Sequence, residues 1–454
     1  MRKSINLFVV FISLVFFAQC LVYADNAETA TQETPKRELL GLKITGFVEN
    51  SNLKNAGAQE GDILTHYNGI KIESLEQLRM IKDKVEQDTV EIVLKRGDEE
   101  IKTNLPKGML GAYLQEIMPE HPVDIDAKLI SGIGQLGWGI GMENSFLGCI
   151  TLLEEKYGSK LSYSDILGLS GYGFRFHFFK GFCPSSPDAT CGRDVGGEVL
   201  KKLGYEFEVY SLSDTCKKCN DEKCKEKEQL LDIIKKGIDQ GFPVIAIDLI
   251  ETAEWGIITG YQKNGKELFC RTYFDMTQGY EIAQKFPWVI YVIKGNKPAN
   301  LDNEYRKSLI TAKELYNKKN YGAYENGLNG IKIWIKTLKD DKFFKSLDEK
   351  KLYETMHANW WIYYSLADAR LTNSKYLITN KGKFGLDEKI IYNLTQLMEK
   401  ESALLQSGFD CVPSIFDHKD ASAWTSELRK NQAKVLSGFL KLEEQVNQIL
   451  KSKI

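Results

Sequence analysis

The apolar positions follow three different periods along the chain, which divide it into three parts. Between 38 and 106 they alternate with polar residues in short runs that turns separate, as is typical of β-strands. From 131 to 296 a helical repeat is followed by several β-type runs, whereas from 297 to 454 apolar residues recur every three or four positions. This pattern predicts a multi-domain α+β protein: a small β-rich domain, a larger α+β domain and a C-terminal helical bundle.

The first part, 38–106, carries clear turn and cap signals. The Asn68-Gly69 pair between two apolar runs predicts a tight hairpin. Ser74 precedes apolar residues at helical spacing, which predicts a helix over 74–85 with Ser74 as its N-cap. Strands are expected at 40–47, 63–67 and 90–94, with a last strand ending at 105–106, and a connector over 107–130 holds a further strand at 109–117 with a break at Gly111.

The second part, 131–296, opens with a glycine-rich stretch and a helix expected over 143–157. Gly132, Gly134 and Gly137 have the spacing of a dinucleotide-binding loop, but the strand that should precede them is weak. A helix at 230–240 and strands at 204–212, 243–250, 254–261, 267–272 and 288–293 follow. A helix before an antiparallel sheet predicts an α+β arrangement.

The third part, 297–454, predicts helices and large core residues. Helices are expected at 304–318, 323–338, 347–371, 386–408 and 421–451. Trp334, Trp360, Trp361 and Trp424 are the largest core candidates. The absence of a clear 34-residue period argues against a tetratricopeptide array.

The N-terminal residues have the pattern of an export signal. Arg2 and Lys3 precede an apolar run over 5–17, and Val22-Tyr23-Ala24 supplies a cleavage site before Asp25. We therefore expect a signal peptide over 1–24, a polar linker over 25–37, an exported protein and no integral membrane span after cleavage. Cys20 offers a lipoprotein as the alternative, although Gln19 fits a lipobox poorly. The mature chain begins at Asp25 if the signal peptide is cleaved in the ordinary way, and at a lipid-modified Cys20 if the protein is a lipoprotein.

Composition excludes one broad class of function. The 454 residues contain 60 Lys and Arg against 62 Asp and Glu, a formal net charge of −2. No excess of positive charge is available to neutralise phosphates, so we expect no nucleic-acid partner.

Eight of the nine cysteines lie beyond the predicted leader, and in an oxidising compartment disulfides are expected. The Cys216-x-x-Cys219-x4-Cys224 motif reads as a disulfide-stapled loop; a zinc site would need a fourth ligand that the motif lacks. Cys183 and Cys191 flank a proline-rich turn that could bring them together. We predict no metal and no cofactor, and no redox role for Cys216 and Cys219, whose charged surroundings lack a thioredoxin-like βαβ pattern.

The first part resembles a bacterial PDZ domain, of the type attached to exported proteases. The resemblance rests on Leu40-Gly41-Leu42, on the run from Asn55 to Leu64, and on Asn68-Gly69. It implies that backbone N–H groups of a short glycine loop bind a peptide's terminal carboxylate while the peptide adds as a strand to the sheet edge. The implied peptide-binding residues are Leu40, Gly41 and Leu42, with Leu78 and Ile81 as pocket walls or as core residues.

The second part resembles the papain-like family of bacteriocin-leader cysteine peptidases and the N-terminal domain of the butirosin biosynthesis acyltransferase. The matching segments are 143–148, 168–175 and 255–261, and 366–370 is similar to the family's helical tail. The resemblance implies a Cys at the start of the helix, a His ahead of the Gly-Tyr strand and an acid on the next strand. This chain departs from that pattern, because Asn144 stands where the Cys is expected and Glu251 to Trp255 contain no His.

Two other residues could replace the missing pair. Cys149 lies five residues beyond Asn144, where a helix turns it toward a different side, and His177 is the one His of this part. Gln135 could supply an oxyanion-hole amide, and Thr272 or Asp275 could take the acid's place. A buried structural Cys149, a packed His177 and a plain tight loop at Gln135 are the competing interpretations.

The sequence therefore predicts an exported protein that binds the C-termini of peptides or proteins through its PDZ-like part and carries a degenerate cysteine-peptidase-like domain. The alternative is an active cysteine-dependent hydrolase or acyltransferase that uses Cys149 as nucleophile and His177 as base.

Overall fold

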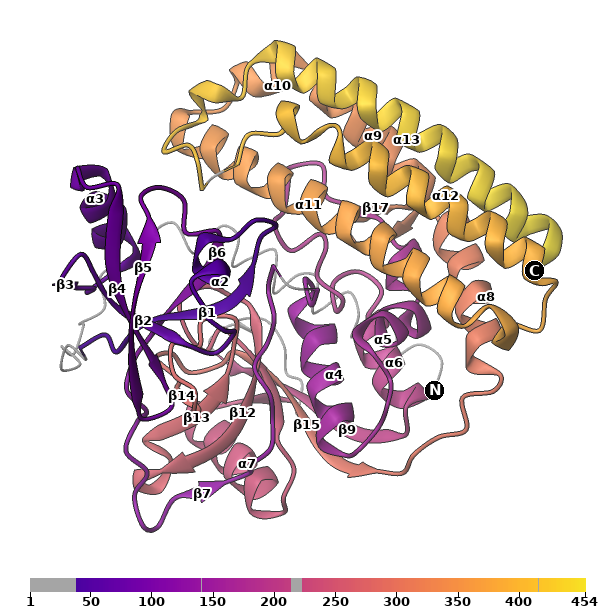
Figure 1. Ribbon diagram of the computed structural model, residues 1–454. Coiled ribbons are helices and arrows are strands. Elements are labelled where there is room, and N and C mark those ends of the chain that lie inside the picture. Colours follow the sequence, from indigo (N-terminus) through magenta and orange to yellow (C-terminus); the bar gives the residue numbers. More distant parts are fainter. Residues whose placement is uncertain (1–37, 140, 214–222, 415) are drawn as a thin grey trace.

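A computed structural model describes residues 38–139, 141–213, 223–414 and 416–454. Figure 1 shows mixed α+β architecture with a helical C-terminal region, as the apolar periods predict. The predicted signal peptide, the linker, Cys20, Cys216 and Cys219 lie outside the described residues. Within the described part of the chain, no helix combines the length and apolar character needed to cross a membrane.

The first sheet has the strand order β5-β4-β2-β1-β6, with β3 paired to β2. Its strands are β1 (Gly41–Phe47), β2 (Ile63–Tyr67), β3 (Ile70–Lys71), β4 (Thr89–Arg96), β5 (Glu99–Pro106) and β6 (Ala112–Ile117), and its helices are α2 (Asn52–Asn55) and α3 (Leu75–Lys84). Asn68 and Gly69 both have positive φ, which confirms the tight hairpin. Ser74 caps α3 by accepting from the backbone N–H of Gln77, as predicted.

The second sheet has the order β10-β9-β15-β11-β12-β13-β14, with β7 paired to β12. Its strands are β7 (Lys128–Leu129), β9 (Tyr205–Leu212), β10 (Cys224–Lys225), β11 (Val244–Ile247), β12 (Trp255–Gln262), β13 (Glu267–Arg271), β14 (Glu281–Ile282) and β15 (Val289–Asn296). The long strands of this sheet pair antiparallel, as predicted. Because both sheet faces are covered, every residue of β12 is buried.

Helices cover the second sheet on both sides. On one face α4 (Ser145–Lys156) and α5 (Tyr163–Ser170) share a core with Ile245, Ile257 and Tyr291. On the other face the apolar side of α7 (Lys227–Asp239) packs against a cluster that contains Val244, Ile258 and Val292. Alternate residues of each strand therefore point to opposite faces of the sheet and belong to different hydrophobic cores. A further helix, α6 (Val195–Lys202), packs on the α4 side.

A third, small sheet joins the second and third parts of the chain. Its order is β16 (Asn320–Tyr321), β17 (Tyr324–Asn326) and β8 (His177–Phe178). The helix predicted from residue 323 begins later, as α9 (Gly327–Leu338), because Asn326 pairs with His177 and Gly327 then turns the chain with a φ of +54°.

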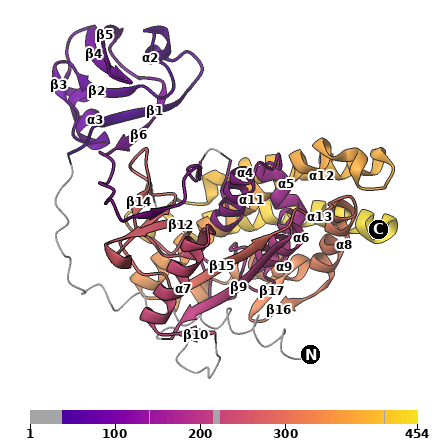
Figure 2. The ribbon, with the colours of Figure 1, turned by 90° about the horizontal axis from the view of Figure 1, so that it is seen from below.

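The remaining helices are α8 (Glu304–Asn317), α10 (Asp341–Lys345), α11 (Glu349–Thr379), α12 (Glu388–Gln406) and α13 (Ser426–Lys453). The three longest, α11, α12 and α13, lie side by side across the upper part of the molecule in Figure 1, and α8 lies below α12. Trp334, Trp360 and Trp424 are buried among them, as expected, whereas Trp361 is half-buried. The first sheet stands away from the other two parts in Figure 2.

Candidate functional site

The peptide-binding edge predicted from the sequence is occupied by the chain itself. Strand β6 pairs antiparallel with β1, with Gly41 opposite Ile117 and Leu42 opposite Glu116. The backbone N–H of Leu40 donates to the Ile117 carbonyl at 2.8 Å. A segment of the predicted connector therefore lies where the resemblance places a bound peptide, and a main-chain carbonyl takes the place of a terminal carboxylate.

Helix α3 lies next to this added strand. The Leu75 N–H at the start of α3 donates to Glu116 Oε1 at 2.7 Å. Leu78 and Ile81 are both buried and belong to the core cluster of the first sheet. Gly41 has a φ of +147°, and a Cβ on it would lie 2.6 Å from the Leu64 carbonyl oxygen, so only glycine fits this position without a shift.

Strand β6 also ties the first sheet to the second part. Gln115 Nε2 donates to the Asp275 carbonyl at 2.8 Å, and the Met118 N–H donates to the Met276 carbonyl at 2.5 Å. The turn that carries Asp275 and Met276 follows β13. The same segment thus fills one edge and anchors that turn.

Cys149 lies in the interior of α4 and is fully buried in the core cluster of that helix. Burial, together with the nearby Glu254 carboxylate, raises the pKa of the Cys149 thiol well above its usual value. A thiol in such surroundings stays protonated and is a poor nucleophile.

His177 lies in a different environment, on β8. Its Nδ1 accepts hydrogen bonds from Nε and Nη2 of Arg175, at 3.1 and 2.6 Å. Burial and the Arg175 charge lower the pKa of His177 well below its usual value. The His177 ring packs beside the rings of Tyr321 and Tyr324. No hydrogen bond among the described residues joins His177 to Cys149. The structure does not bring the predicted pair together.

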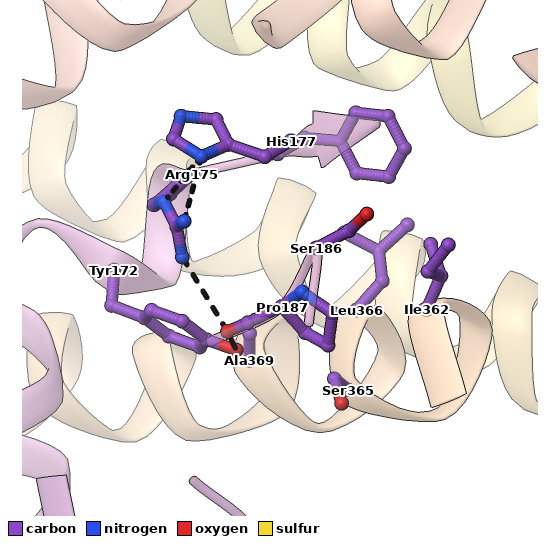
Figure 3. Close-up of a pocket in the computed structure, with 10 residues that line it drawn as sticks. Tyr172, Arg175, His177, Ser186, Pro187, Ile362, Ser365, Leu366 and Ala369 are labelled. Atoms are coloured by element: carbon purple, nitrogen blue, oxygen red, sulfur yellow. Dashed lines mark hydrogen bonds between the residues drawn. The ribbon is translucent and has the colours of Figure 1, made fainter. Parts of the chain in front are cut away.

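A small cavity of about 20 Å³ lies beside Arg175 and His177 (Figure 3). Arg175 and Tyr172 both donate to the Pro187 carbonyl, the latter at 2.6 Å, and Arg175 also donates to the Cys191 carbonyl. This volume is enough for about one water molecule but not for a substrate. These hydrogen bonds fix the 183–194 loop against the 172–175 segment that follows α5, and His177 is left only 3% exposed.

The third predicted catalytic residue is also engaged. Gln135 Nε2 donates to the Thr277 carbonyl at 2.9 Å. Its amide therefore holds the turn after β13, and that hydrogen bond would have to break before the amide could face an oxyanion.

The start of α4 brings together two residues that the sequence did not single out as a pair, Ser145 and Glu254. Asn144 is the N-cap, accepting from the Leu147 N–H, and Ser145 is the first helical residue. Ser145 Oγ donates to Glu254 Oε2 at 2.5 Å and accepts from the Trp255 N–H at 3.2 Å. The signal was present in the sequence, because Glu254 lies in the segment where a base was sought and Ser145 directly follows Asn144.

Further carboxylates surround this helix start. Tyr364 donates to Glu143 Oε2 at 2.8 Å, and the Gly139 N–H donates to the same oxygen. Burial and the Glu143 charge raise the pKa of Asp368 to about 7. Among the described residues, no group of three or more His, Cys, Asp or Glu side chains is arranged to hold a metal ion.

Five of the described cysteines are buried and form no disulfide: Cys149, Cys183, Cys191, Cys270 and Cys411. Cys224, at the start of β10, is disulfide-bonded. Cys183 and Cys191, which the proline-rich turn could have joined, are thus not bonded to each other; Cys183 lies 3.9 Å from the Tyr324 hydroxyl instead. The stapled loop predicted around Cys216 and Cys219 remains a prediction.

Comparison with known proteins adds no assignment. No protein-family model matches the chain, and no curated protein matches it.

Proposed function

We propose that this is an exported protein that binds extended peptide or protein C-termini at the β1 edge of its first sheet, and that β6 is an internal segment that a ligand must displace. The observation that carries the proposal is the pairing of β6 along β1, with the Leu40 N–H donating to the Ile117 carbonyl. An edge that holds one antiparallel segment has the main-chain geometry needed to hold another.

The chemistry of the edge favours a ligand with a free carboxylate. The Leu40 N–H points at an oxygen that ends the paired segment, and a carboxylate accepts a stronger hydrogen bond than a neutral carbonyl. Leu40 itself is 46% exposed, so the loop is open to solvent at this end. Displacement of β6 reduces the apparent affinity by the fraction of molecules whose edge is free.

The α+β part contributes no cysteine-dependent activity in this proposal. Cys149 is buried with a raised pKa, and His177 already accepts from Arg175 through Nδ1. The alternative, a hydrolase or acyltransferase that uses Cys149 and His177, would require both side chains to leave their present surroundings. A thiol-reactive acyl probe that labels Cys149 in the folded protein would restore that alternative.

The test is calorimetric titration of the full chain with a hexapeptide that has the sequence of β6, Ala112 to Ile117, prepared with a free or an amidated C-terminus. A Leu114→Pro variant weakens the internal strand, because proline cannot donate and disrupts pairing. Ile125→Pro is the control, since Ile125 is fully exposed in the same connector and lies outside the strands.

We expect the free-acid peptide to bind Leu114→Pro at least about ten-fold more tightly than the parent chain or Ile125→Pro, because the competing segment is weakened. The amidated peptide should bind less tightly than the free acid. Equal affinity of the two peptides would refute the carboxylate preference. Absence of binding to all three proteins, each verified as folded, would refute the proposed function.

A further inference from the structure

We propose that Ser145 and Glu254 form a nucleophile and general-base pair that hydrolyses acyl esters or amides at the N-terminus of α4. This inference is independent of peptide binding at β1. It rests on the hydrogen bond of 2.5 Å between Ser145 Oγ and Glu254 Oε2, which joins a hydroxyl on the first turn of a buried helix to a carboxylate directly before β12.

The hydroxyl is held in a geometry suited to attack. Ser145 Oγ donates its proton to Glu254 and accepts one hydrogen bond from the Trp255 N–H. A serine hydroxyl has one proton and two acceptor lone pairs, so one lone pair remains for a carbonyl carbon. The proton is already directed to the group that would remove it.

The helix start offers hydrogen-bond donors for the developing oxyanion. Asn144 satisfies the backbone N–H groups of Leu147 and Gly148, through its side chain and its carbonyl. The backbone N–H groups of Ser145 and Phe146 belong to the first turn, where a helix has no internal acceptors. Such a pair at a helix N-terminus is the arrangement that stabilises negative charge next to a nucleophile.

The surroundings of Glu254 make it a stronger base than an ordinary carboxylate. Burial and the Asp188 charge raise the pKa of Glu254 to about 7, while the Ser145 hydrogen bond opposes the rise. The titratable groups that face it are Cys149 on α4, Asp188 on the 183–194 loop and Tyr273 after β13. A general base acts best when its pKa lies close to the working pH.

Asp188 is held in place by hydrogen bonds from its neighbours, and the buried Arg175 guanidinium interacts with its charge. Its Oδ2 accepts from Trp255 Nε1 at 2.7 Å, and its Oδ1 accepts from the Thr190 backbone N–H and hydroxyl. Because Trp255 directly follows Glu254 and also donates to Ser145, these contacts fix the pair. Ser145 is 5% exposed, Glu254 is half-buried and residues 251–253 are exposed, so a substrate would have to reach the pair from the 251–253 side.

The proposed reaction has two balanced steps. Ser145 Oγ bonds to the acyl carbon while its proton passes to Glu254, and the bond to the leaving oxygen or nitrogen then breaks as Glu254 returns the proton to the leaving group. Water next attacks the acyl-serine, giving one proton to Glu254, which passes it back to Ser145 Oγ as the ester bond breaks. The products are a carboxylic acid and the alcohol or amine.

The experiment uses a fluorophosphonate probe, which modifies activated serines, and hydrolysis of p-nitrophenyl acetate by the full chain. The variants are Ser145→Ala, Glu254→Gln and Cys149→Ser, with Ser407→Ala as a control at an exposed serine. Peptide mapping by mass spectrometry locates the label, and thermal melting verifies that each variant folds. None of the substituted residues lies at the β1 edge, so peptide titration of the parent chain tests the peptide-binding proposal separately from this one.

We expect labelling at Ser145 in the parent chain, Ser407→Ala and Cys149→Ser, and none in Ser145→Ala. Glu254→Gln should lower both rates by about 100-fold or more, the usual scale of general-base assistance. The parent rate should rise with pH through about 7 as Glu254 loses its proton, and Glu254→Gln should lose that rise. No labelling of the folded parent chain, equal labelling of Ser145→Ala, or labelling that disappears in Cys149→Ser would overturn the inference.

Discussion

Asp194 shows how one side chain can cap a helix and titrate within the protein. It is the N-cap of α6 and accepts from the Gly197 N–H at 2.6 Å. The Tyr291 hydroxyl donates to its other oxygen at 3.0 Å. These donors favour the ionised form, but burial outweighs them and raises the pKa of Asp194 to about 7.

We predict that Asp194→Asn reduces the pH dependence of stability between about pH 4 and 7. In this window the folded chain keeps a proton on Asp194 that the unfolded chain has lost, so the free energy of unfolding falls as pH rises, by up to about 1.4 kcal/mol per pH unit. Asparagine retains the cap, because its side-chain oxygen accepts the same N–H.

Urea unfolding of both chains from pH 4 to 8 measures this effect. Other buried carboxylates such as Asp368 titrate in the same range, but they are common to both chains and cancel in the difference. Parallel stability curves for Asp194→Asn and the parent chain would contradict the prediction.

Residue identities predicted part of the candidate site. The resemblance pointed to Asn144 as the position of the expected Cys and to Glu251–Trp255 as the position of the expected His, and Glu254 of that segment does contact the start of α4. The residues pointed to these two segments but not to the particular Ser145–Glu254 contact, because an amphipathic pattern locates a helix end only to within a residue or two. Asn144 proved to be the cap, and that single position decides which side chain faces Glu254.

Helices α5 and α11 approach each other through a glycine. Gly168 lies on α5, and a Cβ on it would be 2.0 Å from the Tyr376 ring of α11. The Tyr376 hydroxyl is in turn hydrogen-bonded to Ser308 at 2.9 Å, so the ring cannot simply move away. The close contact of these two helices therefore depends on the missing side chain.

We predict that Gly168→Ala lowers the free energy of unfolding by about 1–3 kcal/mol, because the added methyl group forces the Tyr376 ring or one of the two helices to shift. Gly237→Ala on α7 is the matched control: it is also a buried helical glycine, but its Cβ would meet its nearest atom at 3.4 Å. That variant should be neutral or more stable by up to about 1 kcal/mol.

Denaturant unfolding of the two variants compares these effects under the same conditions. Equal stability changes for Gly168→Ala and Gly237→Ala would show that close packing at Tyr376 is not the cause.

Most helices and strands whose apolar residues recur at a regular spacing could be predicted from the sequence. Helices α3, α4, α7, α8 and α12 and the long strands of the first two sheets match the expected ranges within a few residues. Helix α11 extends eight residues beyond its expected end, α13 begins five residues later than expected, and the two-residue strands β3, β7, β10 and β14 were not expected. Helix α5 was missed because nearly all its residues are buried, so it has no polar face to reveal the helical repeat. Strand β6 was anticipated as a strand, but its partner was not, because pairing is a long-range property that a local pattern does not contain.

Arg370 joins the helical part of the molecule to the α+β part. Its Nε contacts Glu443 of α13 at 2.7 Å and Glu401 of α12 at 3.4 Å, and all three side chains are buried. Its Nη1 donates to the Gly173 carbonyl at 2.7 Å. One guanidinium thus connects three helices with the segment that follows α5.

We predict that Arg370→Met lowers the free energy of unfolding by roughly 3–5 kcal/mol, because it leaves two buried carboxylates without their positive partner. Lys332→Met is the control, since the Lys332–Glu444 pair also reaches α13 but is exposed and should contribute little. Chemical unfolding followed by far-UV circular dichroism measures both, and similar losses for the two variants would contradict the prediction.

The double attachment of β6 has a consequence for how the two proposed activities would communicate. Expulsion of β6 by a ligand would also break the hydrogen bond from Gln115 to the Asp275 carbonyl and strain the one from the next residue after β6, Met118, to the Met276 carbonyl. The same turn carries Tyr273, whose hydroxyl donates to the Met142 carbonyl three residues before Ser145. Peptide binding at β1 and substrate binding at Ser145 would then oppose each other through this turn. The factor by which a bound peptide weakens substrate binding would equal the factor by which a bound substrate weakens peptide binding.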